Sequence, residues 1–199
     1  MNPAFLTAIA CLLFVQCNRD EEGQVNFIKA GEVSGKKLFN FNESFSIEEP
    51  VEFEYSYSYF ASVPLNIDEN NDFDIRLIMG CNTYDGADII RHFQIIDNGN
   101  NFEIAVDTNI IIVNETDTII QTKLFGFSDI ISHNENWSPG YSFISVYYNC
   151  PPVYYNINPL VTNKYIGVRK KTNAGYRYGW LNVKVIDLKQ IIVEQSCFN

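Results

Sequence analysis

Long apolar runs are nearly absent from this sequence of 199 residues. The longest extends from Ala4 to Val15 and is interrupted only by Thr7. A helix that crosses a membrane needs ~20 apolar residues, so this run is too short to span the hydrocarbon core. Its length is instead typical of the hydrophobic region of a signal peptide. The sequence therefore predicts export and no transmembrane helix.

Positive charge is also scarce. The chain has 14 Lys and Arg against 24 Asp and Glu, which gives a formal net charge of −10 at pH 7. General affinity for nucleic acid or for anionic lipid surfaces depends on clustered Lys and Arg. The nearest cluster is Arg169-Lys170-Lys171, and a solvated turn between two strands explains it. We therefore expect no nucleic-acid partner.

Residues that build catalytic centres are few. The only histidines are His92 and His133, and Cys-His catalysis needs a histidine beside the thiolate. The sequence contains no G-x-S-x-G, no H-E-x-x-H, no Gly-rich phosphate loop and no Cys-x-x-Cys. The 24 acidic residues offer many carboxylate pairs for a glycosidase, but nothing selects one pair. We expect a protein that is not an enzyme, and a carboxylate-based hydrolase is the third alternative.

The apolar run ends on a cysteine that defines where the protein is expected to reside. Leu13-Phe14-Val15-Gln16-Cys17 resembles a bacterial lipobox, in which the cysteine thiol takes a diacylglycerol and becomes the first residue of the mature chain. The cluster Asp20-Glu21-Glu22 is similar to a signal that exports lipoproteins to the cell surface. The resemblance implies a signal peptide over 1–16, a lipidated tether over 17–23 and a domain over 24–199. A cleaved signal with a periplasmic or secreted product is the alternative.

The domain is expected to be all-β. Aromatic residues make up 15% of the chain, and helical periodicity is hard to find after the signal peptide. Glu52 to Phe60 alternates clearly, with aromatic residues on one face and polar residues on the other. We predict a single antiparallel β-sandwich, jelly-roll-like in character. Its expected strands cover 24–30, 36–41, 52–60, 73–79, 89–96, 101–106, 110–113, 118–124, 141–148, 164–169, 178–185 and 191–194.

Turn residues predict how some strands pair. Asn98-Gly99 is a strong hairpin signal, so 89–96 and 101–106 are expected to pair across Asp97 to Asn100. A second pair is expected across Asn114 to Asp117, and Gly80 to Gly86 is interpreted as a loop. Gly167 and Gly179 inside strands indicate a bulge or a close approach of the backbone to an aromatic ring. Trp180 and Tyr165 are predicted to form the centre of the core.

One polar segment has the spacing of a calcium loop. Asp68, Asn70 and Asp72 stand at alternate positions and Asp74 follows, so their oxygen atoms can converge on one Ca²⁺ ion. Phe73 replaces the glycine of the usual loop, and no glutamate follows at the bidentate position. A polar turn that leads into a strand explains the same residues. Calcium is the only metal or cofactor that the sequence suggests.

Three cysteines remain after Cys11 and Cys17 are assigned to the signal peptide and the anchor. An exported domain meets oxidising conditions, so one disulfide is expected among Cys81, Cys150 and Cys197. We favour Cys150–Cys197, because this bond would tie the C-terminal tail to the loop before the last hairpin. Three free buried thiols are the alternative.

The stretch from about Pro64 to Glu194 carries a resemblance to a family, and its most specific part is the last pair of strands. Lys164-Tyr165-Ile166-Gly167-Val168-Arg169 and Tyr178-Gly179-Trp180-Leu181-Asn182-Val183-Lys184-Val185 follow a Ser128-Asp129-Ile130-Ile131 segment with a tryptophan nearby. This order resembles a group of uncharacterised secreted or lipid-anchored β-sandwich proteins of Gram-negative bacteria. The resemblance implies a fold and a cellular location, and it implies no activity.

The sequence thus predicts a protein held by lipid in the outer membrane, facing the cell exterior, which acts as a non-catalytic binding or structural module. Its expected partners are the membrane, through the lipid, and a surface glycan or protein. The first alternative is a glycan-binding accessory lipoprotein that uses Trp137, Tyr154 and Tyr155, because exposed aromatic rings in loops stack on sugars.

Overall fold

The structure of the chain is a computed structural model, which describes residues 27–33, 36–46, 57–66, 75–84, 88–99, 101–112, 118–150, 153–186 and 188–199. The predicted signal peptide, the predicted lipidation residue Cys17 and the calcium candidates Asp68, Asn70, Asp72 and Asp74 lie outside these residues. Every element of the described residues is a strand, which confirms the predicted all-β fold. The strands are β1 (Phe27–Lys29), β2 (Lys37–Ser46), β3 (Tyr57–Leu65), β4 (Ile75–Tyr84), β5 (Asp88–Asp97), β6 (Phe102–Ile112), β7 (Thr118–Thr122), β8 (Leu124–Phe125), β9 (Ile130–Ser132), β10 (Asn136–Ser138), β11 (Tyr141–Cys150), β12 (Val153–Ile157), β13 (Val161–Thr172), β14 (Gly175–Ile186) and β15 (Gln190–Phe198).

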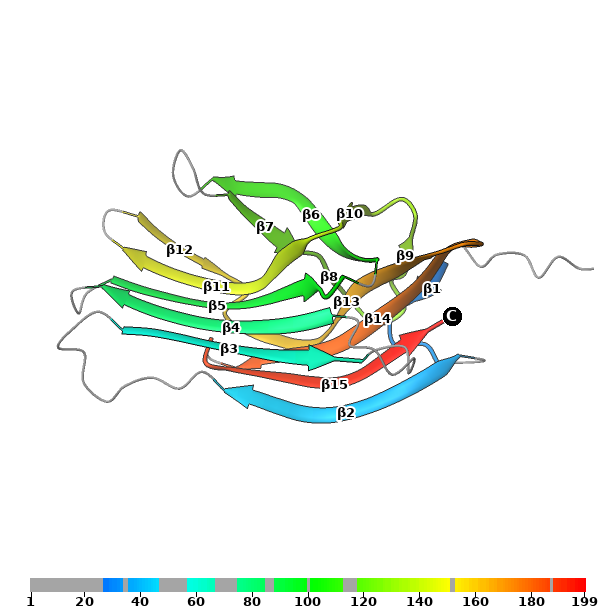
Figure 1. Cartoon of the computed structure of the whole chain (residues 1–199), viewed down its shortest axis with the longest axis horizontal. Coiled ribbons are helices and arrows are strands. Elements are labelled where there is room, and N and C mark those ends of the chain that lie inside the picture. Colours follow the sequence, from blue (N-terminus) through cyan, green and yellow to red (C-terminus); the bar gives the residue numbers. More distant parts are fainter. Residues whose placement is uncertain are drawn as a thin grey trace, which may run out of the picture.

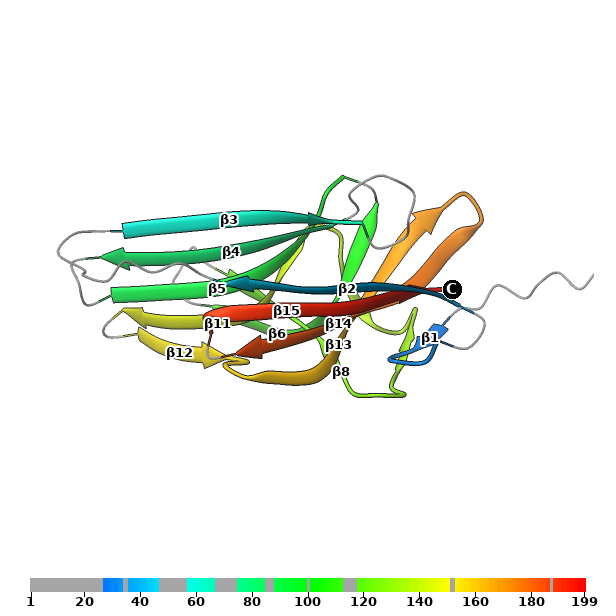
Figure 2. The ribbon, with the colours of Figure 1, turned by 90° about the horizontal axis from the view of Figure 1, so that it is seen from below.

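The strands form two layers that are joined at one place (Figure 1). One layer has the order β2-β15-β14-β13-β6, and the other has β3-β4-β5-β11-β12, whose strands lie side by side in Figure 2. β7 joins them, because it pairs antiparallel with β6 and makes one parallel bridge with β11, between Gln121 and Phe143. We call them the C-terminal layer and the central layer. Their arrangement agrees with the predicted antiparallel sandwich.

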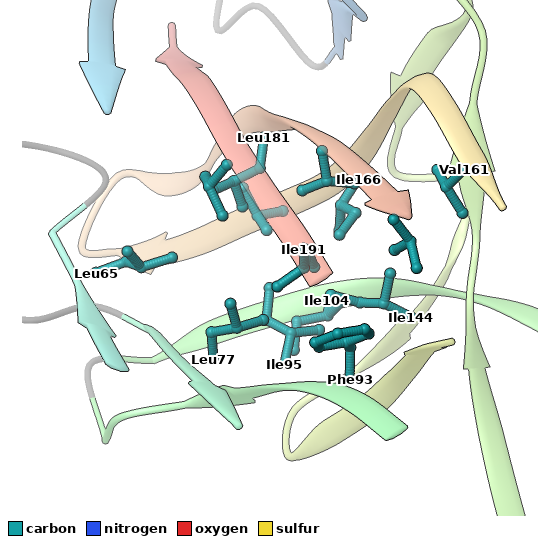
Figure 3. Packing of buried hydrophobic residues seen from close by; sticks show 14 of the residues in the cluster. Leu65, Leu77, Phe93, Ile95, Ile104, Ile144, Val161, Ile166, Leu181 and Ile191 are labelled. Atoms are coloured by element: carbon teal, nitrogen blue, oxygen red, sulfur yellow. The ribbon is translucent and has the colours of Figure 1, made fainter. Parts of the chain in front are cut away.

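The main core lies between the two layers. Figure 3 shows side chains of both layers packed against one another. Alternate residues of each strand supply them, as a pleated strand requires. The labelled members from the central layer and its neighbours are Leu65, Leu77, Phe93, Ile95 and Ile144, and those from the C-terminal layer are Ile104, Val161, Ile166, Leu181 and Ile191.

A second cluster covers the opposite face of the C-terminal layer. Trp180, Tyr178 and Cys197 point away from the main core, and the short pair β1–β9 and the segment 124–138 cover them. We call this group the outer cluster. Its buried members are Ile28, Ala30, Ala105, Phe125, Ile131, Tyr178, Trp180 and Cys197. β14 is therefore buried on both faces, which explains why its sequence is apolar at nearly every position from Tyr178 to Val185.

Trp180 and Tyr165, which we predicted at the centre of the core, contact each other but do not lie in the main core. Trp180 is 1% exposed, and its ring meets Tyr165 edge-on with centroids 5.2 Å apart. Both residues belong to the outer cluster and not to the space between the layers. Alternation identifies two faces of a strand, but it does not identify which face lies between the two large layers.

The predicted hairpin of the family-like segments is confirmed as β13–β14. Their register pairs Gly167 with Trp180 and Val168 with Gly179. A Cβ atom on Gly179 would lie 2.6 Å from the Phe198 ring, and one on Gly167 would lie 3.0 Å from Phe125 and Ile131. Both glycines therefore allow the close approach that the sequence indicates. The strands extend further than predicted, so only Asn173 and Ala174 remain in the turn. The expectation that Arg169-Lys170-Lys171 forms a solvated turn is wrong, because these residues lie within β13 and the Arg169 side chain is 14% exposed.

The hairpin predicted across Asp97 to Asn100 is wrong. β5 pairs with β4 and β11, whereas β6 pairs with β7, β10 and β13, so the chain crosses between the layers here. Gly99 and Asn101 have positive φ angles of 88° and 61°, and the Asp97 side chain accepts the Phe102 N–H at 3.2 Å. These residues make a tight turn, but the strands then diverge. The second predicted pair, β6–β7, is confirmed.

The loop predicted over Gly80 to Gly86 is wrong over its first half. β4 continues to Tyr84, and Gly80 lies within it, opposite His92 of β5. A Cβ atom on Gly80 would overlap the imidazole of His92. This glycine therefore makes room for a ring on the neighbouring strand and does not end its own strand.

The predicted Cys150–Cys197 disulfide is not formed. Cys197 is a free, buried thiol in β15, between Trp180 of β14 and Leu38 of β2. Cys150 is the last residue of β11, in the central layer. In Figure 1 that end of β11 lies at the left, and the C terminus is marked at the right. Cys81 is also buried and forms no disulfide.

Candidate functional site

A surface groove lies where β10 pairs with β6. Its volume is about 430 Å³. The pairing sets Trp137 opposite Ala105 and Asn136 opposite Val106, and this register brings the side chains of β10 to the end of β7. We call it the Trp137 groove. Its lining residues are Val106, Asp107, Ile120, Asn136, Trp137, Ser138 and Pro139.

The indole of Trp137 contacts the guanidinium of Arg169 and the ring of Tyr178. The Arg169 guanidinium carbon lies 4.5 Å from the centroid of the Trp137 ring and 4.1 Å from that of Tyr176. Tyr178 contacts the same indole, with ring centroids 5.9 Å apart. A guanidinium over an aromatic face is attracted by the ring quadrupole. Arg169 and Tyr178 thus orient Trp137 before any ligand binds, and Tyr176 contacts the other member of the stack, Arg169.

Arg169 is fixed in turn by Glu103 on the neighbouring strand β6. Its Nε donates to Glu103 Oε2 at 2.6 Å, and its terminal nitrogen forms an ion pair with the same oxygen. Both side chains are less than one-fifth exposed, at 14% and 19%. Because this pair is partly removed from water, it is screened less than a surface pair. The groove therefore rests on a rigid support.

Asp107 places a carboxyl group in the groove. Burial raises the pKa of this carboxyl, and the nearby charge of Lys123 lowers it by a smaller amount. Lys123 is itself engaged, because its Nζ donates to Glu135 Oε2 at 2.6 Å. A partly desolvated carboxylate is a strong acceptor for hydroxyl and amine donors.

The lining of the Trp137 groove is mixed in character. It combines an aromatic ring and apolar side chains with one carboxyl and one amide, which is the composition of many small-molecule sites. The hydroxyl of Ser138 is used structurally, because it donates to the Tyr141 carbonyl at 3.0 Å. Among the described residues of the lining, none is a histidine or cysteine beside that serine.

A second hollow adjoins the first across Pro139. It has a volume of about 250 Å³ and carries carboxylates of both β5 and β6. Lys171 provides the opposite charge at its margin. Its lining residues are Asp97, Asn101, Phe102, Glu103, Pro139 and Lys171. An elongated polar ligand in the Trp137 groove could therefore extend past Pro139.

The structure does not bring the predicted aromatic binding residues together on one pair of strands. Trp137 lies on β10, which pairs with β6, whereas Tyr154 and Tyr155 lie on β12, which pairs with β11. Tyr154 is 64% exposed, and the side chain of Tyr155 is outside the described set. Of the three predicted residues, Trp137 is the one that lines a groove.

Sequence reasoning missed two other features. Asp107 and Asn136 line the groove. In the sequence, the one feature that could have pointed to them is that they interrupt or adjoin apolar strand segments. His92 lies outside the groove, where it contacts Phe143 edge-on with centroids 5.5 Å apart. Burial lowers the pKa of His92 to about 4. The sequence feature that could have indicated this buried ring is Gly80, a glycine on the neighbouring strand that leaves room for the imidazole.

Comparison with protein-family models, with curated proteins and with solved structures gave no match. Within the part of the chain that the structure describes, no helix is long and apolar enough to cross a membrane. Across the same residues, no group of three or more His, Cys, Asp or Glu side chains is placed to hold a metal ion.

Proposed function

We propose that this protein is a non-catalytic binding or structural module, anchored by lipid on Cys17 in the outer membrane and displayed at the cell surface. The anchor is supported by the apolar run that ends in Leu13-Phe14-Val15-Gln16-Cys17. Two or three acyl chains would hold the protein stably, since one chain alone is marginal. The observation that carries the binding role is the Trp137 groove, because its aromatic residue is oriented in advance by Arg169 and Tyr178.

A glycan is the ligand class that the lining of the groove favours. Sugars present apolar C–H faces, which stack on aromatic rings, and hydroxyl groups, which need acceptors such as a carboxylate or an amide. Trp137, Asp107 and Asn136 supply these groups within one groove. A protein ligand would favour a larger and more continuous apolar surface.

Tryptophan emission tests this function directly. We expect neutral oligosaccharides to change the emission of the protein, since Trp137 lines the groove and the other tryptophan, Trp180, is 1% exposed. Asp107→Asn removes the charge of the acceptor and should weaken binding about tenfold, because a hydrogen bond to a charged group contributes roughly 1.5–3 kcal/mol. Asp129→Asn, on an exposed turn outside the groove, should bind like the unmodified protein.

Two outcomes would contradict the proposal. If Asp107→Asn and Asp129→Asn weaken binding equally, the Trp137 groove is not the site. If the oligosaccharide is recovered cleaved, the protein is a hydrolase and the non-catalytic assignment fails. Mass analysis of the sugar after incubation separates binding from cleavage.

A further inference from the structure

Exposed apolar side chains gather around the short pair β1–β9. Phe27 is 44% exposed, Ile130 is 55% exposed, and Phe127, in the turn before β9, is 67% exposed. Val33, in the turn after β1, is 42% exposed. We call these four residues the β1–β9 patch. Half of the large apolar side chains that are exposed in the described part of the chain lie here, on two short segments.

The pairing of β1 with β9 explains why Phe27 and Ile130 face outward together. Ile28 and Ile131 are directly opposite each other, and both are 0% exposed because they pack into the outer cluster. Phe27 pairs with Ser132 and Lys29 with Ile130, so Phe27 and Ile130 are diagonal neighbours on the other face. The two outward residues therefore form one surface.

The turn after β1, which leads to Val33, and the turn before β9, which contains Phe127, lie side by side. The Ser128 N–H donates to the Ala30 carbonyl at 2.8 Å, and the Ala30 N–H donates to the Asp129 carbonyl at 2.9 Å, which holds the turns side by side. Gly31 has φ 77°, and a Cβ atom there would lie 2.6 Å from the Phe127 ring. The Phe127 ring thus rests on bare backbone and is still two-thirds exposed.

The charges beside the patch are paired with one another. Lys29 and Glu32 form an ion pair at 3.4 Å, and the Ser128 hydroxyl donates to Glu32 at 2.9 Å. The bond from Ser128 holds the pKa of Glu32 below its usual value, so this carboxylate stays charged beside Lys29. Because both signs are present, the patch offers apolar contact and little net charge to a partner.

The position of the patch in the chain identifies its partner. Phe27 is ten residues after Cys17, so the chain between them can reach at most ~35 Å. A lipid on Cys17 would hold the patch near the bilayer at high effective concentration, where even weak apolar contacts are occupied. We propose that the β1–β9 patch inserts into the interfacial region of the membrane that carries the lipid. This inference rests on the anchor in the proposed function.

The proposal orients the molecule. β1 lies at the right-hand end of the molecule in Figure 1, near the marked C terminus. The end of β11 and the start of β12, at the left-hand end of the molecule in Figure 1, would then point away from the bilayer. Phenylalanine and isoleucine side chains gain free energy in proportion to the apolar area removed from water, and this holds in the outer part of a bilayer as well.

Quenching by brominated lipids tests the inference. The lipidated full chain, extracted from membranes, is reconstituted in phosphatidylcholine vesicles with brominated acyl chains. The variant Phe127→Trp should lose most of its added emission relative to vesicles without bromine. Leu160→Trp is the matched control, because Leu160 is 66% exposed in the turn between β12 and β13 and should keep its emission. The emission of the unmodified protein, with Trp137 and Trp180, is subtracted.

The outcomes separate this inference from the anchor itself. If the intact mass shows lipid on Cys17 and Phe127→Trp is not quenched, the anchor stands and the membrane contact is wrong. Equal quenching of Leu160→Trp would show that no particular face meets the bilayer, which also overturns the inference. Emission at position 127 that shifts to shorter wavelength without quenching would identify a second copy of this chain as the partner instead, and would also overturn the inference. A chain without lipid would overturn both proposals.

Discussion

At the scale of single residues, burial changes the pKa of His92 by a large amount. It lies on β5 over Gly80 of β4, with its ring edge-on to Phe143 of β11. Removal from water disfavours the charged imidazolium, and burial therefore lowers the pKa from 6.5 to about 4. His92 is neutral in the folded protein at neutral pH, where it acts as a packing residue.

This pKa makes stability depend on pH in a defined window. Below pH 6.5 the unfolded chain binds a proton at His92 that the folded chain does not bind until about pH 4. The free energy of unfolding should therefore fall as the pH falls through this window, by up to roughly 3 kcal/mol from this residue. Urea unfolding at pH 7.5 and pH 5 measures the effect.

The matched variants isolate the contribution of His92. His92→Gln should remove most of the loss of stability between pH 7.5 and pH 5, whatever its effect at pH 7.5. His133→Gln, on an exposed turn, should leave the pH dependence as it is. The account of His92 is wrong if both variants keep the same dependence as the unmodified protein.

At the scale of elements, the short strand β10 is held mainly by side chains from other strands. Trp137 of β10 contacts Arg169 of β13, which also covers Tyr176 of β14 and pairs with Glu103 of β6. A strand of three residues has few backbone hydrogen bonds of its own. The stack therefore supplies a large part of what fixes the wall of the Trp137 groove.

A double-mutant cycle measures this support. Arg169→Met and Glu103→Gln should each lower the free energy of unfolding, because each leaves the remaining charged side chain partly buried and without an opposite charge beside it. The coupling between them should fall in the range of roughly 0.5–3 kcal/mol that contacting residues show. Lys164→Met, on an exposed position of the same strand, should be nearly neutral. Additive effects of the two changes would show that the pair does not support the strand.

The elements differ in how well the sequence predicts them. β13–β14 was predictable because alternation is strong and the turn at Asn173 and Ala174 is short and local. The turn at Gly99 has the same local chemistry, yet it sends the chain to the other layer. Turn residues define a local backbone conformation, and the choice of partner strand depends on packing far away in the sequence.

The Trp137 groove was only partly predictable for a related reason. Trp137 could be proposed from its residue type, but its neighbours Glu103, Arg169 and Tyr176 come from three separate strands. Asp107 carries no local signal, since its place in the groove follows from the pairing of β6 with β10. Long-range pairing of this kind cannot be derived from one sequence by periodicity alone.

At the scale of the whole molecule, the sandwich contains two buried clusters and one surface groove. The main core joins the two layers, the outer cluster fixes β1–β9 to the C-terminal layer, and the Trp137 groove lies beside β10. We infer that the β1–β9 patch meets the membrane and that the groove binds a ligand. The first of these roles requires the protein to be held at a membrane surface, whereas the second does not.

Lipidation of Cys17 can be measured by the intact mass of the protein extracted from membranes. We expect a chain that begins at Cys17 and carries two or three acyl chains. In the Cys17→Ala variant that mass should be absent, and the protein should no longer partition with the membrane as a lipidated species. A chain without lipid, or one that begins at another residue, would contradict the central claim that this domain is anchored through Cys17.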